Sequence, residues 1–142
     1  MSVIRIHKWM SKLFLILFIG AVFVSCNNDD DDNSNPAADN SINAVAGTFK
    51  GTLNIGGQDY YNAIITVTKV DNSHVKVQAK SGEAYSSVTT KTLSAVNPVG
   101  VSIVGSDSEG SISYLISTKA LTVSTQKTSA TDIIYLFQGT QQ

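Results

Sequence analysis

Cysteine, arginine and proline are scarce in this chain of 142 residues. Cys26 is the only cysteine and Arg5 the only arginine, and there are two prolines. A single cysteine excludes an internal disulfide, and with one histidine after it, His74, it leaves no zinc cluster. No glycine-rich loop leads into a helical pattern, so a phosphate cradle is not expected either. The sequence therefore predicts no metal and no cofactor.

Charge of one sign is also lacking in the part of the chain after residue 46. Residues 47–142 carry seven lysines, six acidic residues and no arginine. A nucleic-acid surface needs a basic excess and usually presents the forked guanidinium of arginine. We therefore expect no nucleic-acid partner.

Residues 1–24 combine a basic segment with a short apolar one. Arg5, Lys8 and Lys12 lie in the first twelve residues, which contain no acid, and residues 13–24 are apolar. About 12 apolar residues are too few to cross a hydrocarbon core of about 30 Å, which needs roughly 20. The pattern is typical of a secretory signal peptide. It predicts that residues 1–25 direct export, rather than anchor the chain as a membrane span.

Cys26 lies where the apolar run ends and a polar, acidic run begins. We expect its thiol to be a lipid attachment point. With Ser25 before the cysteine and Phe23 where leucine is usual, the stretch resembles a bacterial lipoprotein signal of the looser Bacteroidetes form. In that group an acidic run such as residues 29–32 resembles a signal for export to the cell surface. The resemblance implies a lipid anchor at Cys26 and a place on the outer membrane, facing the cell exterior.

Residues 27–46 are rich in Asn, Asp and Ser and contain few apolar side chains. Such a segment cannot bury enough surface to fold by itself. Twenty residues could reach roughly 65 Å if fully extended, at about 3.3 Å each. The aspartate run lacks the glycine and the final glutamate of a calcium loop. We expect residues 26–46 to form a flexible tether and residues 47–142 to form one folded domain.

Apolar and polar side chains alternate with a period of two through residues 47–142. Val75, Val77 and Ala79 alternate with polar neighbours, as do Ile112 and Tyr114. Turn-forming Gly, Asn, Asp and Ser separate the runs. The pattern predicts an all-β fold, an antiparallel up-and-down meander of about eight strands. The expected strands are 47–55, 60–70, 74–80, 84–95, 99–104, 110–117, 119–125 and 132–139.

Pairing of the last run, 133–139, with the first, 47–51, would remove the two exposed edges of an open meander. Eight strands suit a small closed barrel, which is either just filled or holds one small ligand. A β-sandwich is the alternative. Residues 47–53 resemble the opening strand of the calycin and lipocalin-like barrels of Bacteroidetes lipoproteins, with Phe49 where related lipocalins and avidins have tryptophan. The resemblance implies a lipocalin-like barrel.

Catalytic chemistry finds little support in the sequence. His74 follows Asp71 and Ser73, but these residues have the composition of a hairpin turn, which is far commoner than a compact triad. Four further carboxylates flank strands, where solubility and turn formation explain them: Asp59, Glu83, Glu109 and Asp132. We predict that the protein is not an enzyme.

The aromatic residues are the remaining candidates for a binding site. Those expected inside the barrel, where they would line a pocket or simply pack, are Phe49, Tyr114, Tyr135 and Phe137. About 96 residues bury limited surface, which favours packing. Tyrosines near turns, which could form an exposed contact patch, are Tyr60, Tyr61 and Tyr85.

These features leave three functional hypotheses open. The first is a lipid-anchored carrier or capture module that binds a small apolar ligand inside the barrel. The alternative is a protein-interaction or assembly module at the outer membrane. The third is an unrecognised hydrolase that uses His74.

Overall fold

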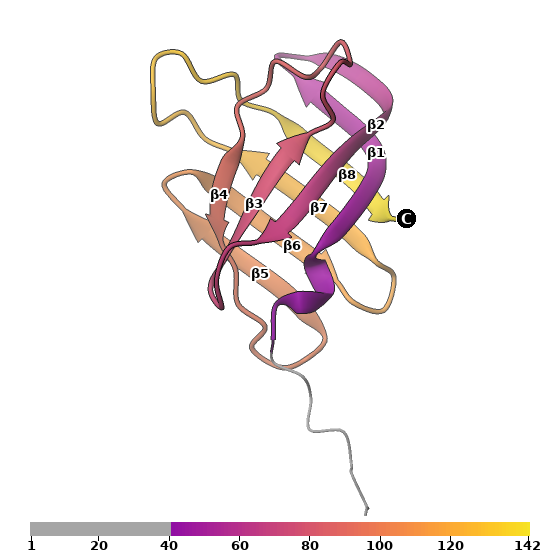
Figure 1. Cartoon of the computed structure of the whole chain (residues 1–142), viewed down its shortest axis with the longest axis vertical. Coiled ribbons are helices and arrows are strands. Elements are labelled where there is room, and N and C mark those ends of the chain that lie inside the picture. The colour runs from indigo at the N-terminus through magenta and orange to yellow at the C-terminus, as the bar shows by residue number, and fades with distance from the viewer. Residues whose placement is uncertain (1–40) are drawn as a thin grey trace, which may run out of the picture. The chain divides into compact units, whose positions relative to one another are not determined.

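Eight antiparallel strands follow one another up and down in the computed structural model, which describes residues 41–142 (Figure 1). A short 3₁₀ helix, η1 (Asn43–Val45), precedes them. The strands are β1 (Gly47–Ile55), β2 (Gln58–Lys69), β3 (His74–Ala79), β4 (Lys91–Ser94), β5 (Ser102–Asp107), β6 (Gly110–Leu115), β7 (Ala120–Thr125) and β8 (Leu136–Gln141). The predicted fold class, an all-β up-and-down meander of eight strands, is confirmed.

The first and last strands pair, so the sheet curls into a nearly closed barrel with the order β4-β3-β2-β1-β8-β7-β6-β5. In this pairing Gly51 lies opposite Gly139, and Leu53 lies opposite Phe137. The expected pairing of the last run with the first is thus confirmed. The barrel, rather than the sandwich, is the observed architecture.

The β4–β5 seam is the loosest part of the barrel wall. Val96 and Val104 form an isolated bridge there. The carboxylate of Asp107 accepts hydrogen bonds from the backbone N–H and the hydroxyl of Ser94, at 2.6 and 2.7 Å. Side-chain hydrogen bonding therefore joins the two strands where a backbone ladder does not.

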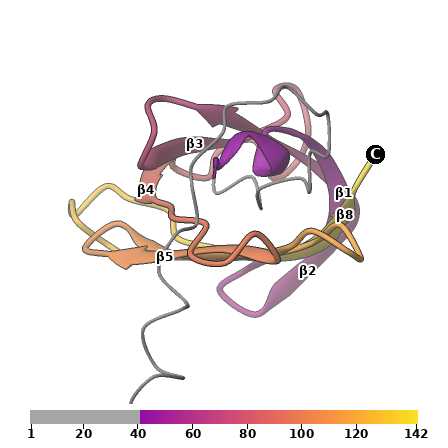
Figure 2. The ribbon, with the colours of Figure 1, turned by 90° about the horizontal axis from the view of Figure 1, so that it is seen from below.

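The barrel is flattened. Figure 2 shows β5 to β8 as a nearly flat layer, with β1 to β3 curving over the other side. The long β1–β2 hairpin contains a register shift between Gly51 and Leu53.

The side chains that alternate inward form one hydrophobic cluster that occupies the barrel interior. Phe49, Leu53, Ile65, Val123 and Phe137 are completely buried, and each such side chain contributes about 1.5–3 kcal/mol to the free energy of folding. The period-two pattern of the sequence is therefore the signal that places the core.

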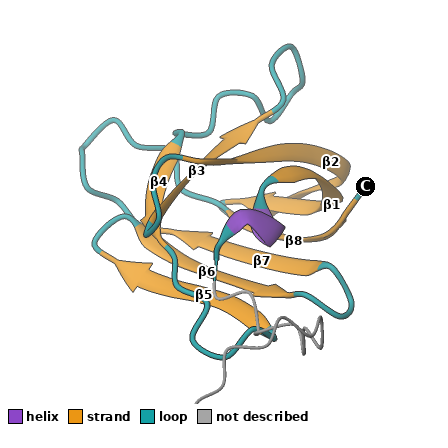
Figure 3. Cartoon of the chain, turned by 60° about the horizontal axis from the view of Figure 1, so that its bottom comes forward, coloured by secondary structure: helices purple, strands orange, loops and turns teal. Residues whose placement is uncertain are grey.

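Short segments cover both ends of the barrel. At the end where the described chain begins, η1 lies across the opening, and Ile42 and Val45 are buried (Figure 3). At the opposite end, the segment between β3 and β4 buries Tyr85 and Val88. The packed domain thus extends to Ile42, five residues before the predicted start at residue 47.

The predicted strand 84–95 is largely wrong, because only Lys91–Ser94 is a strand. Residues 81–90 instead form successive turns, in which the hydroxyl of Tyr85 accepts a hydrogen bond from the N–H of Ile64 at 2.9 Å. The start of β8 is likewise later than predicted, because residues 126–135 form a loop. Burial of aromatic and β-branched residues at a barrel end produces the same sequence pattern as burial in a strand.

Among residues 41–142, no helix has the length and the apolar character that a membrane span requires. The predicted signal peptide, Cys26 and the first part of the tether lie outside the described residues.

Candidate functional site

The four aromatic residues predicted to face the interior all lie in the core. Phe49, Tyr114, Tyr135 and Phe137 are each at most 4% exposed. The rings of Phe49 and Tyr114 meet edge to face, with centroids 5.8 Å apart and an interplanar angle of 87°. The hydroxyl of Tyr114 donates to Oε1 of Gln141 at 2.7 Å. These side chains pack against the rest of the core, and their role in ligand binding stays a prediction.

Tyr135 differs from the other three because its hydroxyl is buried without a hydrogen-bond partner among the described residues. Its backbone is well held, since its N–H donates to Oγ1 of Thr125 at 2.8 Å. Burial raises the pKa of its phenol. A buried hydroxyl without a partner costs free energy.

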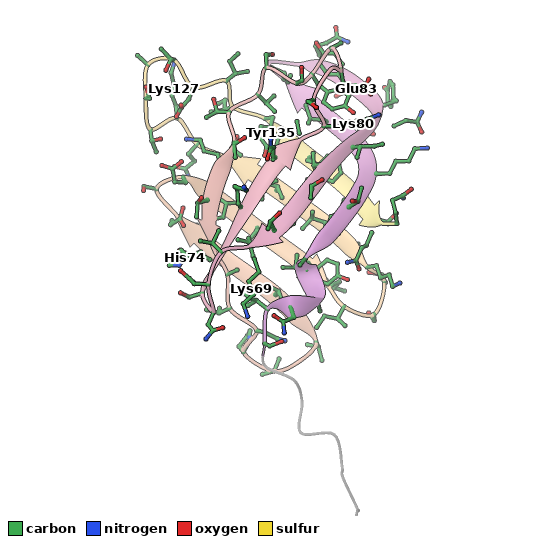
Figure 4. All side chains as sticks on the ribbon, in the orientation of Figure 1. Lys69, His74, Lys80, Glu83, Lys127 and Tyr135 are labelled. Atoms are coloured by element: carbon green, nitrogen blue, oxygen red, sulfur yellow. The ribbon has the colours of Figure 1, made fainter. Side chains whose placement is uncertain are left out.

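His74, Asp71 and Ser73 do come together, in the turn between β2 and β3. Both Oγ of Ser73 (3.1 Å) and Oδ2 of Asp71 (2.9 Å) contact the same ring nitrogen, Nδ1 of His74. A catalytic relay needs the acid on one imidazole nitrogen and the nucleophile on the other. Figure 4 shows His74 at the end of the barrel opposite Tyr135. The contacts fit turn formation and do not fit activation of the serine.

The carboxylate of Asp71 is a hydrogen-bond acceptor of that turn. Its Oδ1 accepts the backbone N–H of Ser73 at 2.7 Å. This bond and the contact with His74 lower the pKa of Asp71 to about 2.

Lys91 forms a buried charge cluster that the sequence did not reveal. Its side chain is 2% exposed, and Nζ lies 2.7 Å from Oδ2 of Asp132, 2.7 Å from Oε2 of Glu109 and 2.8 Å from Oγ1 of Thr128. The hydrogen bond from Lys91 is the largest cause that lowers the pKa of Asp132. The cluster joins β4 to the β5–β6 turn and to the β7–β8 loop. Lys91 lies 41 positions before Asp132 and 18 positions before Glu109 in the sequence, and nothing in the local pattern pairs residues so far apart.

All four flanking carboxylates have side-chain partners. Glu109 and Asp132 contact Lys91, Asp59 accepts a hydrogen bond from Asn54 at 2.6 Å, and Glu83 pairs with Lys80 at 2.8 Å (Figure 4). In the part of the chain that the structure describes, no three His, Cys, Asp or Glu side chains gather as a metal site would require.

The predicted patch of three exposed tyrosines is wrong. Tyr61 is 73% exposed, but Tyr85 is 6% exposed and the ring of Tyr60 packs against it, with centroids 5.9 Å apart. Tyr85 is drawn inward by the turns of residues 81–90. Tyr61 is left as an exposed aromatic residue on β2.

The outer face of the flat layer carries no charged side chain. Its residues alternate with the buried ones along β5 to β8, and we call them the uncharged face: Ser102, Val104, Ser106, Ser111, Ser113, Leu115, Ala120, Thr122, Ser124, Leu136, Gln138 and Thr140. Within these four strands Asp107 is the one charged residue, whereas β1 to β4 contain Lys50, Asp59, Lys69, Lys76 and Lys91.

Comparisons with protein-family models, with curated proteins and with solved structures give no match to this chain.

Proposed function

We propose that this protein is an exported, lipid-anchored β-barrel lipoprotein of the lipocalin-like kind, without enzymatic activity, which binds a protein of the outer membrane through its uncharged face. The observation that carries the proposal is the contrast between the interior and the exterior. Hydrophobic side chains occupy the interior, and both ends are covered by buried residues. The outer face of β5 to β8 is flat, exposed and free of charge.

Exposed sheet faces usually carry lysine or other charges, because uncharged ones associate. This face has Ser and Thr side chains interrupted by exposed Val104, Leu115 and Leu136. Such a surface suits a partner whose own surface is uncharged, because no buried charge is left unpaired in the complex.

The size of the face favours a weak contact. Four strands about 4.8 Å apart, with six residues of about 3.3 Å each, span roughly 400 Å². A standard stable interface buries about 800 Å² on each partner. A lipid anchor at Cys26 would compensate, because two proteins on one membrane meet at a high effective concentration.

The test is recovery of the partner by the full chain from an outer-membrane fraction. Thr122→Lys puts a charge in the middle of the uncharged face, and Thr66→Lys puts the same charge at an exposed position of β2. We expect Thr122→Lys to lose a stoichiometric partner that the wild type and Thr66→Lys retain. Equal recovery by the two variants, or no partner in any sample, would contradict the proposal.

A second candidate function, the binding of a small apolar ligand inside the barrel, is supported by the unpaired hydroxyl of Tyr135. A ligand with one polar group would satisfy it. Thermal shift with fatty acids, retinoids and tetrapyrroles tests this idea. A shift that Tyr135→Phe abolishes would support it, whereas no shift with any of the three classes would count against it.

The proposed anchor is tested separately. Cys26→Ser should abolish metabolic labelling with fatty acid and release the chain from the membrane fraction. Persistent labelling of that variant would refute the anchor without bearing on the uncharged face.

A further inference from the structure

An open groove of about 440 Å³ crosses the outside of β2, β1 and β8. Side chains that line it are Lys50, Thr52, Tyr61, Asn62, Thr140 and Gln142. Its volume lies within the range of about 300–1,000 Å³ that small-molecule sites occupy. Neither the core nor the Lys91 cluster uses these side chains.

A β-bulge in β2 creates the groove. Gly51 pairs with Ala63, but Leu53 pairs with Tyr60, so Thr52 faces the two residues Tyr61 and Asn62. Regular alternation would turn one of these two side chains inward, whereas both are exposed and lie between partly buried Tyr60 and buried Ala63. Asn62 has a φ of 57°, a left-handed conformation that asparagine tolerates better than most residues. The bulge thus sets an aromatic ring and an amide side by side on the surface.

The chemistry of the groove suits a hydroxyl-rich ligand that also has an apolar face. The ring of Tyr61 offers a flat apolar surface, and it is 73% exposed. The Thr hydroxyls and the Asn and Gln amides both donate and accept hydrogen bonds, as sugar hydroxyls do. Lys50 is the single charged side chain that lines the groove, and no Asp or Glu side chain does.

A peptide fits this surface less well. Recognition of an extended peptide relies on a free sheet edge or on a series of apolar pockets. The strands here are already paired on both sides, since β1 lies between β2 and β8, and the groove offers one ring.

We propose that this groove binds a saccharide, with the sugar ring stacked on Tyr61, its hydroxyls bonded to Thr52, Asn62 and Thr140, and an acidic sugar favoured by Lys50. The groove adjoins the uncharged face and shares Thr140 with it, but Tyr61 on β2 belongs to the groove alone and Thr122 on β7 to the uncharged face alone, so variants at these two residues test the two proposals separately.

The experiment is a glycan array, with neutral and uronic-acid oligosaccharides, probed with the full chain. We expect binding that Tyr61→Ala lowers about tenfold or more and Tyr61→Phe retains, because phenylalanine keeps the ring. Lys50→Gln should lower binding of acidic oligosaccharides several-fold and leave neutral ones unchanged. Thr92→Ala, an exposed change on β4 outside both the groove and the uncharged face, is the control and should bind as the wild type does.

Asn62→Gly separates a ligand contact from a structural role. Glycine accepts the left-handed backbone, so the bulge persists, but the amide is lost. The proposal predicts weaker saccharide binding by Asn62→Gly at an unchanged melting temperature. It is overturned if the folded wild type binds no saccharide, if Tyr61→Ala binds as well as Tyr61→Phe, or if Asn62→Gly binds as the wild type does. Recovery of a membrane partner by Tyr61→Ala should be normal, which distinguishes this site from the uncharged face.

Discussion

Replacing Gly51 by alanine perturbs the contact that closes the barrel. Gly51 of β1 lies opposite Gly139 of β8. A Cβ atom on Gly51 would overlap the carbonyl oxygen of Gln138 and the Cα atom of Gly139, which are backbone atoms that cannot rotate away. Gly51 is not among the glycines with a positive φ, so the effect of the substitution is steric and not conformational.

Two opposing effects decide the sign of this prediction. At a position with free space, Gly→Ala stabilises a protein by about 0.4–1 kcal/mol, because the unfolded chain loses entropy. Overpacking costs typically about 1–3 kcal/mol. Since the obstacles are backbone atoms of the paired strand, we expect a cost in the upper part of that range, which less the entropic gain is a net loss of about 2 kcal/mol in the free energy of unfolding. For a domain of this size, a loss of about 2 kcal/mol lowers the melting temperature by roughly 8–16 °C.

Urea and thermal denaturation of the wild type, Gly51→Ala and Ser113→Ala measure this loss. Ser113 is exposed on β6, so its replacement should change the free energy of unfolding by no more than about 0.5 kcal/mol. Stabilisation by Gly51→Ala would refute the reasoning, because it would mean that β1 and β8 do not approach each other in this register.

Three further predictions concern ionisable groups. Lys91→Met should lower the melting temperature more at pH 7 than near pH 3. The lowered pKa of Asp132 stabilises the fold fully above about pH 4, and part of this contribution is gone at pH 3, the rest being lost only as the pH falls through the folded-state pKa. Equal losses at both pH values, measured by calorimetry, would contradict this. NMR titration should give Asp71 a pKa of about 2, and His74→Ala should raise it only part of the way to the usual value, because the backbone hydrogen bond is the larger cause. A full return to the usual value would show that the imidazole dominates. Tyr135→Phe should leave the free energy of unfolding unchanged or raise it by up to about 1 kcal/mol, because it removes a buried hydroxyl without a partner. Clear destabilisation would contradict this, because it would mean that the hydroxyl of Tyr135 makes a hydrogen bond in the folded protein.

Alternation of side chains predicted the strands well where one face is buried and the other is exposed. Residues 47–55 were predicted as a strand and β1 has those bounds. The closing pair of strands followed from a general argument about edges, which needs no detail of packing. The strand predicted around Tyr85 and Val88 is wrong, because these residues are buried on turns at the end of the barrel. A buried residue on a turn and a buried residue in a strand look the same in the sequence.

The candidate sites were predicted less well than the strands. The bulge shows in the burial pattern of β2, which changes from an even position at partly buried Tyr60 to odd positions at buried Ala63, Ile65 and Val67, but the sequence alone hides this change because Tyr61 and Ile64 are apolar as well. An interruption of the alternation of this kind marks an extra residue in one strand. The Lys91 cluster has no signal in the sequence either, because it depends on the three-dimensional approach of β4 and two loops.

The claim that the protein acts through the uncharged face is tested most directly by photo-cross-linking in intact cells. A benzophenone amino acid is placed either at Thr122 of that face or at Thr66 of β2. Thr66 is also exposed, and it lies on the half of the barrel that carries the charged side chains. We predict one discrete cross-linked adduct with an outer-membrane protein from position 122 and none from position 66. Absence of an adduct at position 122, or the same adduct from both positions, would contradict the account.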